Sequence, residues 1–430
     1  MRYRAAVPID GFRAAEDSLN LSSQSGRLHK IQISSLLMLW ENLTHRPHRT
    51  AIRRLVFQIH LWIGIAIGLY VFGISVTGAT LVLREEIEIL LYPQLFRHDR
   101  TEGTESQRAT PTMVLKGVQS AYHDFTISAI YSPTGKRDTF MVYINRNEDY
   151  RTAYADPVTG AALGEVPRDS FLGWVQDLHF NLLAGSTGRL LNGVGGLALL
   201  LLGFTGLMIW WPGVSTWKHG LTVNFRKNWT RIIWELHGAT GFWTLALILM
   251  WGLTGAYFTF PQQYRSVVEA VSPTTRFTPP LSDLTLRDSY TPADIDSLAI
   301  RAVEESRGRE LWGVDIPSTD DGAIEIVTAT IRRDRWANRD QREFYFDRFS
   351  GELLAQHDPV NRTLGDIVMA WIVPLHFGTF AGLASRIVWL VLGLTPALLS
   401  VTGALVWWNR VLRNRWPKPV QPETDGSGHR

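Results

Sequence analysis

Four long runs of this chain contain no charged side chain, and polar segments of unequal length separate them. The runs cover residues 61–83, 190–211, 238–260 and 387–408. A helix needs about 20 apolar residues to cross the hydrocarbon core of a bilayer. Each run reaches that length, although only 45% of the 430 residues are hydrophobic. The pattern therefore predicts four membrane-spanning helices.

The two long polar segments, residues 84–178 and 261–375, each begin with a stretch typical of a helix that starts at proline. Those stretches cover residues 111–122 and 292–306, and the strands expected after them cover residues 126–131, 139–144, 311–316 and 323–331. Each segment then has a motif of the form Tyr-x-Asp-x-x-(Thr/Ser)-Gly, at residues 154–160 and 345–351. Asp followed by Gly four residues later is typical of a turn between strands. We therefore expect both segments to be α+β domains outside the membrane.

Several short motifs occur twice at a fixed spacing, which indicates an internal duplication. His179, inside Leu-His-Phe, recurs 197 residues later as His376 in the same tripeptide. His60, six residues after an arginine, recurs 177 residues later as His237 in the same setting. A Thr-Gly dipeptide also lies at matching positions of the four spans, at residues 77–78, 205–206, 254–255 and 402–403. The duplication predicts two halves of similar fold, each with two spans and one outer domain.

Basic residues cluster at the ends of the spans that lie away from the two outer segments. They are Arg46, Arg49, Arg53 and Arg54 before the first span, Lys218, Arg226, Lys227 and Arg231 between the second and third, and Arg410, Arg413, Arg415 and Lys418 after the fourth. Positive charge near span ends marks the cytoplasmic side. Both termini are therefore expected in the cytoplasm and both outer segments in the periplasm of a bacterial inner membrane. The net charge of +3 is small, so we expect the bilayer, and no nucleic acid, as a partner.

The predicted boundaries follow from these signals. A cytoplasmic N-terminal extension covers residues 1–52, and its apolar patch at 31–40 is too short to span a membrane. The span regions are 53–83, 179–211, 232–260 and 376–409, the outer domains are 84–178 and 261–375, and the cytoplasmic loop and tail are 212–231 and 410–430. The expected fold class is an α-helical membrane protein with α+β periplasmic domains, internally duplicated.

The candidate chemistry lies in four histidines, because the chain contains no cysteine. Without cysteine there are no disulfides, iron–sulfur clusters or covalently attached haems. Parallel repeats are related by an axis along the membrane normal, so equivalent residues share a depth. His60 is then expected to face His237 at the inner leaflet, and His179 to face His376 at the outer leaflet. Two imidazoles at each depth are what two six-coordinate haems require, with the iron bound by these four side chains.

Four arginines accompany the histidines and have two candidate roles. Arg189 and Arg386 each follow an outer histidine by ten residues, while Arg54 and Arg231 each precede an inner one. Their guanidinium groups could pair with haem propionates as part of the cofactor site. They could equally anchor the ends of the spans in the membrane interface.

One basic cluster has no counterpart in the other half of the chain. It comprises Arg332, Arg333, Arg335, Trp336 and Arg339 in the second outer segment. It is a candidate docking surface for a polar or anionic substrate, although a solvated hairpin tip would have the same composition. The remaining histidines, among them His219 and His357, have no counterpart either and are expected at the surface.

The order of these motifs resembles the PepSY-associated transmembrane family. The shared pattern is Arg-x5-His with Thr-Gly, a segment with an Asp-x-x-(Thr/Ser)-Gly turn, and then Leu-His-Phe, Gly-x3-Arg, Thr-Gly and Trp-Trp, and it extends from Arg53 to Arg410. The resemblance implies two PepSY-like periplasmic segments and two haems b, bound by His60, His179, His237 and His376. It also implies a ferric-siderophore reductase, an oxidoreductase that converts Fe(III) to Fe(II) in the periplasm for iron uptake.

The electron donor and acceptor define the competing interpretations. No Gly-rich dinucleotide loop follows a predicted strand, so another protein or a quinol is expected to supply electrons from the cytoplasmic or membrane side. Siderophore oxygens suit hard Fe(III) better than softer Fe(II), so reduction loosens the iron. The alternatives are a haem protein with another acceptor, such as a quinone or a different metal chelate, a regulatory or binding PepSY protein without redox activity, and a transporter. The spans lack charged groups at mid-membrane, which argues against transport.

Overall fold

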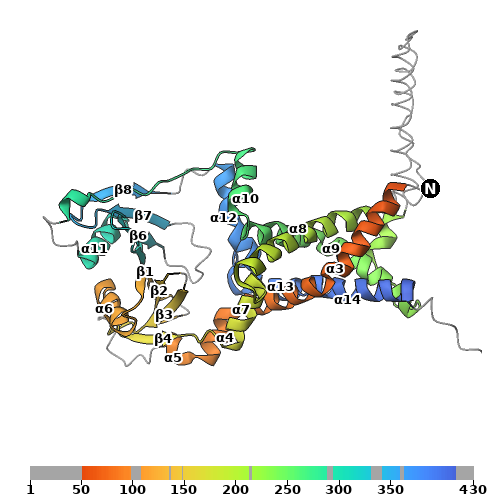
Figure 1. Cartoon of the computed structure of the whole chain (residues 1–430), viewed down its shortest axis with the longest axis horizontal. Coiled ribbons are helices and arrows are strands. Elements are labelled where there is room, and N and C mark those ends of the chain that lie inside the picture. Colours follow the sequence, from red (N-terminus) through yellow and green to blue (C-terminus); the bar gives the residue numbers. More distant parts are fainter. Residues whose placement is uncertain are drawn as a thin grey trace, which may run out of the picture.

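The computed structural model describes residues 51–97, 108–134, 137–147, 149–212, 216–287, 294–330, 341–358 and 363–412. Apolar helices form an elongated bundle, and an antiparallel sheet lies beyond one end of it (Figure 1). Both ends of the described chain lie at the opposite end of the bundle (Figure 1). The predictions for the N-terminal extension, the arginine cluster at 332–339 and the C-terminal residues after 412 lie outside the described residues.

Four segments of the described chain are long and apolar enough to cross a membrane, as the sequence predicted. Three are single helices: α3 (Ala51–Val82), α8 (Gly185–Trp210) and α9 (Trp229–Tyr257). The fourth consists of α13 (Gly382–Gly393) and α14 (Thr395–Trp407), followed by a π-helical turn, η5 (Trp408–Leu412). Most residues of each span are not buried within the protein, so apolar side chains face outward. The protein is therefore a multi-pass membrane protein.

The fourth span is interrupted at Pro396, which has no backbone N–H to donate. Helix α13 ends at Gly393 and α14 begins at Thr395. The hydroxyl of Ser75 on α3 donates to the Gly393 carbonyl (2.5 Å) and accepts from the N–H of Ala397 (3.1 Å). A neighbouring helix thus satisfies the backbone groups that the break exposes, as a hydrocarbon environment requires.

Strands from both outer segments combine in one antiparallel sheet. In spatial order they are β4 (Ala162–Glu165), β3 (Asp149–Ala155), β2 (Phe140–Arg146), β1 (Thr126–Tyr131), β5 (Glu310–Asp315), β6 (Ile324–Ala329), β7 (Gln341–Phe346) and β8 (Leu353–His357). At the centre, Ile130 of β1 lies opposite Val314 of β5. The sequence assigned the two segments to two domains, but each alone would expose an unpaired edge at β1 or β5. Pairing β1 with β5 removes both edges, so the two segments share one sheet.

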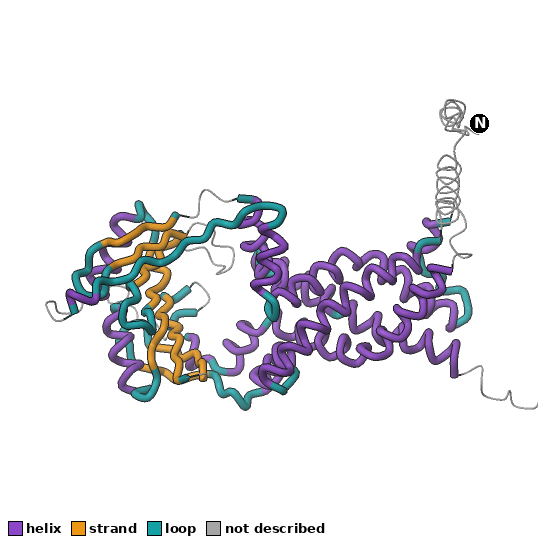
Figure 2. Tube along the Cα trace, turned by 45° about the horizontal axis from the view of Figure 1, so that its top comes forward, coloured by secondary structure: helices purple, strands orange, loops and turns teal. Residues whose placement is uncertain are grey.

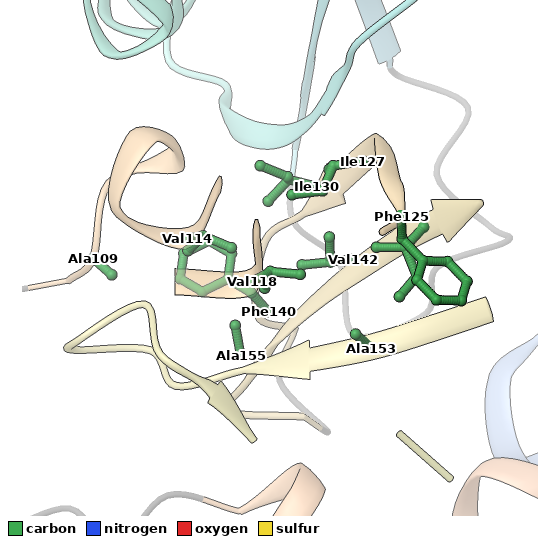
Figure 3. Packing of buried hydrophobic residues seen from close by; sticks show 11 residues of the cluster. Ala109, Val114, Val118, Phe125, Ile127, Ile130, Phe140, Val142, Ala153 and Ala155 are labelled. Carbon is green, nitrogen blue, oxygen red and sulfur yellow. The ribbon is translucent and has the colours of Figure 1, made fainter. Parts of the chain in front are cut away.

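Helices α6 (Pro111–Ala121) and α11 (Ile295–Glu305) cover one face of the sheet (Figure 1). Each begins at a side-chain cap, because Thr110 and Asp294 accept hydrogen bonds from backbone N–H groups of the first turn. Their apolar sides pack against alternate residues of the strands, and Figure 3 shows the cluster around the fully buried Val118. The core of the sheet domain therefore lies between the strands and these two helices.

The two Tyr-x-Asp-x-x-(Thr/Ser)-Gly motifs fold into the turns that the sequence predicted. Oδ1 of Asp156 accepts hydrogen bonds from the backbone N–H groups two and three residues later, at 2.9 and 2.8 Å. Asp347 accepts the same pair of bonds at the same distances. Gly160 and Gly351 close the turns with φ angles of 72° and 71°, a region in which other residues are strained.

Short helices connect the sheet to the bundle (Figure 2). After the first and third spans the chain forms α4 (Arg84–Leu91), α5 (Pro93–Phe96) and α10 (Pro261–Glu269), and before the second and fourth spans it forms α7 (Phe171–Asn181) and α12 (Leu364–Phe377). Two 3-10 turns, η2 (Trp217–Leu221) and η3 (Leu284–Leu286), lie in the connecting loops. The ends of α7 and α12 therefore meet the bundle at its sheet end.

The sheet face opposite α6 and α11 looks toward the bundle (Figure 1). The strand registers place a row of acidic residues on this face. Asp315 on β5 lies directly opposite Glu325 on β6, and Glu325 lies opposite Tyr345 on β7. Like charges at opposite positions destabilise a sheet. Burial raises the pKa of Asp315 to about 6 and that of Glu325 to about 7, and neighbouring carboxylates such as Glu343 add to the effect. These two groups therefore take up protons just below neutral pH.

We predict that Glu325→Gln raises the melting temperature at about pH 7.5 and leaves it unchanged at about pH 4.5. A carboxyl whose pKa is raised by folding stabilises the fold while protonated, and this contribution is lost as the pH rises through the folded-state pKa. Glutamine stays neutral at both pH values. Thermal unfolding of the full chain in detergent measures the difference, with about 2–4 °C expected per kcal/mol in a domain of this size.

Glu310→Gln is the matched control, because Glu310 is exposed on the same sheet. The control should leave the melting temperature unchanged at both pH values. An equal shift for Glu325→Gln at the two pH values would show that its ionisation does not limit stability.

Candidate functional site

Four imidazole rings form two pairs at different heights of the bundle. His60 on α3 and His237 on α9 lie toward the end away from the sheet, with ring centroids 6.4 Å apart. His179 on α7 and His376 on α12 lie toward the sheet end, with ring centroids 6.5 Å apart. The structure thus brings together the two pairs that the sequence placed at a common depth.

Each imidazole contacts a threonine on the neighbouring span of the same half of the chain. Nδ1 of His60 lies 3.0 Å from the hydroxyl oxygen of Thr205, and Nδ1 of His179 lies 3.0 Å from that of Thr77. In the second half, Nδ1 of His237 lies 3.0 Å from the hydroxyl oxygen of Thr402, and Nδ1 of His376 lies 2.8 Å from that of Thr254. These threonines are the first residues of the four Thr-Gly dipeptides found in the sequence. The sequence showed that the dipeptides recur but gave them no role in the site.

The glycine of each dipeptide gives the imidazole ring room. A Cβ atom at Gly78 would lie 2.8 Å from Cε1 of His179, well inside the usual contact distance of carbon atoms. A Cβ atom at Gly206 would lie 3.2 Å from Cε1 of His60, and one at Gly403 would lie 3.2 Å from Cε1 of His237. At Gly255 the corresponding distance to Cε1 of His376 is 3.6 Å. Threonine binds Nδ1 and glycine admits the ring, and we call this pair the Thr-Gly seat of each histidine.

The spacing of each histidine pair fits an iron atom with one imidazole on either side. A metal–imidazole bond is about 2 Å long and its nitrogen lies about 1 Å from the ring centre, which separates two axial rings by about 6 Å. The observed separations of 6.4 and 6.5 Å agree with this value. Threonine engages Nδ1 of each ring, so Nε2 is the nitrogen available to a metal. The donor set therefore fits two haems with paired imidazole ligands.

Three of the four accompanying arginines lie at the edges of the site. Arg54 and Arg189 are exposed. Arg231 forms an ion pair with Glu235 at 2.8 Å, and its guanidinium lies 4.6 Å from the ring centre of Trp234. Their pairing with haem propionates stays a prediction, and the surroundings of Arg231 also match the alternative of an interfacial anchor.

Arg386, for which the sequence left open a haem propionate or an anchor in the membrane interface, has carboxylate partners. Its side chain is buried at the start of α13, where Nη1 lies 3.8 Å from Glu85 and Nη2 forms an ion pair with Glu86. Arg137, from the loop between β1 and β2, lies 3.5 Å from Glu85. Buried charges persist only when they are paired, which explains why α4 presents two glutamates here. The four side chains join the fourth span, α4 and the sheet.

His357 was expected at the surface, but its side chain is partly buried and has two partners. The ring stacks on Phe277 with centroids 4.5 Å apart, and Nδ1 lies 2.8 Å from Oε2 of Glu343. Glu343 lies opposite His357 through the pairing of β7 with β8. Only knowledge of that strand register could have indicated the contact. The candidate docking residues Arg332, Arg333, Arg335, Trp336 and Arg339 lie outside the described residues.

These features define a multi-pass membrane protein with two partly buried histidine pairs and a sheet domain at one end. Residues 57–410 match the family described as the PepSY-associated TM region, and the chain belongs to that family. A similar curated protein is an uncharacterized protein of Pseudomonas aeruginosa, 25% identical over 257 residues. The match covers 54% of this chain and 62% of the relative, so the chain spans less than two thirds of that protein.

We predict that Gly78→Ala destabilises the protein and that Gly73→Ala, on the same helix, does not. The new Cβ at position 78 would collide with His179, while nothing lies within 4 Å of the corresponding position at Gly73. Overpacking of this kind costs about 1–3 kcal/mol. Gly255→Ala should have a small effect, because its Cβ would meet His376 at an ordinary 3.6 Å. Thermal unfolding of the three variants measures the order, and equal losses would show that the glycines serve helix packing in general.

Proposed function

We propose that this protein is a dihaem b-type electron-transfer protein of the bacterial inner membrane that reduces ferric siderophores in the periplasm. The observation that carries the proposal is the spacing of the two histidine pairs, 6.4 and 6.5 Å between ring centroids. Haem at each pair would supply reversible one-electron chemistry. His60 with His237, and His179 with His376, would hold the haems and leave no coordination position open, which would favour electron transfer over oxygen binding.

The internal duplication that we infer from the sequence supports two equivalent cofactor sites. From the central β1–β5 pair, the strand order reads β2-β3-β4 on one side and β6-β7-β8 on the other. Ala129 lies opposite Asp315 and Tyr131 lies opposite Gly313, as a two-fold axis beside Ile130 would require. The same axis, extended along the membrane normal, accounts for the meeting of equivalent histidines.

The acceptor would bind at the sheet end of the bundle, where the His179–His376 pair lies nearest to the outer domain. One electron converts Fe(III) to Fe(II), and the hard oxygen ligands of a siderophore hold Fe(II) less tightly. The chelate then releases its iron as Fe(II), and no covalent bond of the siderophore is broken. Arg189 is exposed near this end and can attract an anionic chelate.

The donor would act at the other end, near the His60–His237 pair. The basic residues at the span ends predict that this side is cytoplasmic, with both termini there. The sequence contains no Gly-rich dinucleotide loop after a predicted strand, so we expect no NAD(P)H or flavin site in the chain itself. The donor would therefore be a reduced protein or a quinol. Electrons would then cross the bilayer from the inner to the outer pair, and a chelate outside would receive them.

We predict that the purified full chain binds two haems b with low-spin spectra. His179→Ala and His60→Ala should each lose one haem or turn one high-spin, because an axial ligand is missing. The measurements are haem per chain and absorption spectra before and after dithionite. His219→Ala is the matched control, since His219 is exposed and outside both pairs; it should keep both haems.

The acceptor is tested on the reduced protein. Ferric siderophores should reoxidise it, and a ferrous chelator should capture the iron that is released. Rapid reoxidation by a quinone alone would replace the siderophore with that acceptor and keep the haem sites. A chain that stays free of haem after expression in a haem-replete host would overturn the redox function and favour a regulatory or binding role.

A further inference from the structure

The four threonines of the Thr-Gly seats each make a second hydrogen bond. Their hydroxyls donate to backbone carbonyls one turn earlier: Thr77 to Gly73 (2.7 Å), Thr205 to Leu201 (2.6 Å), Thr254 to Met250 (2.7 Å) and Thr402 to Leu398 (2.8 Å). A carbonyl oxygen only accepts, so at these distances the hydroxyl proton must lie between the two oxygens. A hydroxyl has a single proton, and its oxygen is therefore left to accept a hydrogen bond from the histidine.

This arrangement fixes the position of the hydrogen on each imidazole. Nδ1 must carry it, because a lone pair on Nδ1 would face the lone pairs of the threonine oxygen. His179 gives independent support, since its Nδ1 also lies 3.1 Å from the Ile74 carbonyl, which can only accept. A neutral imidazole with hydrogen on Nδ1 has its lone pair on Nε2.

We propose that the four seat threonines are positioning residues that lock the histidines in the Nδ1–H tautomer. The lock leaves Nε2 free for a metal and makes the imidazole a more basic ligand, as hydrogen-bond partners of metal-bound histidines generally do. Threonine suits the role in a membrane because its hydroxyl is satisfied on both sides without water. The consequence for haem affinity rests on the proposed function, whereas the tautomer belongs to the chain itself.

The four histidines depend on their threonines to different degrees. The Ile74 carbonyl lies 3.1 Å from Nδ1 of His179, and the carbonyls of Leu202 and Leu399 lie near His60 and His237. Within the described part of the chain, His376 Nδ1 has a hydrogen bond to the Thr254 hydroxyl and none to a carbonyl. Removal of the Thr254 hydroxyl should therefore have the largest effect of the four.

The test compares Thr254→Val with Thr244→Val, a matched control on the same helix. Thr244 is buried and donates to the Thr240 carbonyl at 2.8 Å, as Thr254 does to its own helix, but among the described residues it forms no hydrogen bond with a histidine. The first readout is the ring nitrogen resonances of 15N-histidine in the haem-free full chain in liposomes at about pH 8, where imidazole is neutral. The His376 signal is assigned by its loss in a His376→Asn chain.

We expect Nδ1–H for His376 in the wild type and in Thr244→Val, and a mixture or the Nε2–H form in Thr254→Val. Thr254→Ser should restore Nδ1–H, because serine keeps the hydroxyl. The second readout is haem binding, which should weaken by about 10–100-fold in Thr254→Val. The reduction potential of the outer site should rise in the same variant, since a less basic ligand stabilises Fe(III) less. Thr77→Val should show smaller changes of the same sign.

The two proposals fail in different ways. If Thr254→Val keeps the Nδ1–H tautomer, the threonine lock is overturned, whatever the haem content. If the wild type binds no haem while the tautomer changes as described, the lock stands and the electron-transfer function falls. Should Thr254→Val not fold, Thr77→Val decides, and a chain in which the His179 tautomer, the haem affinity and the reduction potential are all unchanged would then overturn the lock.

Discussion

The absence of water from the hydrocarbon core is the constraint on which this structure depends, because every polar group there needs a partner within the protein. Threonine hydroxyls meet the constraint twice, donating to a carbonyl of their own helix and accepting from a histidine of another. Ser75 meets it at the break in the fourth span by bridging α13 and α14. The histidine pairs can lie within the bundle because such short side chains satisfy them. The two histidine pairs are thus built mainly from the requirements of the membrane.

The two halves satisfy the same requirement with different side chains. On the first half, Asn192 of α8 donates to the carbonyl of His179 at 2.7 Å, and Tyr70 donates to the Asn192 side chain at 2.7 Å. On the second half, the indole of Trp389 donates to the carbonyl of Leu375 at 2.7 Å. Each contact fixes the C-terminal end of a histidine-bearing helix, α7 or α12, to a neighbouring span. The end of the helix is held in both halves, although different side chains hold it.

The junction between the sheet and the bundle is polar and asymmetric. Arg386 and Arg137 converge on Glu85 from the fourth span and from the β1–β2 loop. The corresponding arginine of the first half, Arg189, remains exposed. Buried ion pairs fix orientation more than they add stability, since each charge loses its hydration. The cluster therefore sets how the shared sheet stands over the outer histidine pair.

The sequence by itself determined the four spans, the two Asp–Gly turns and the pairs of histidines, because apolar length, local turn chemistry and repeated motifs all act over short stretches. The tertiary structure alone decided that β1 joins β5, that Arg386 pairs with Glu86 and that His357 lies against Glu343. Those contacts join residues far apart in the chain, and nothing local announces them. The Thr-Gly seats lie between the two cases: the repeat of the dipeptide is visible in the sequence. Only the packing of one span against the next shows that threonine binds the ring and glycine makes room for it.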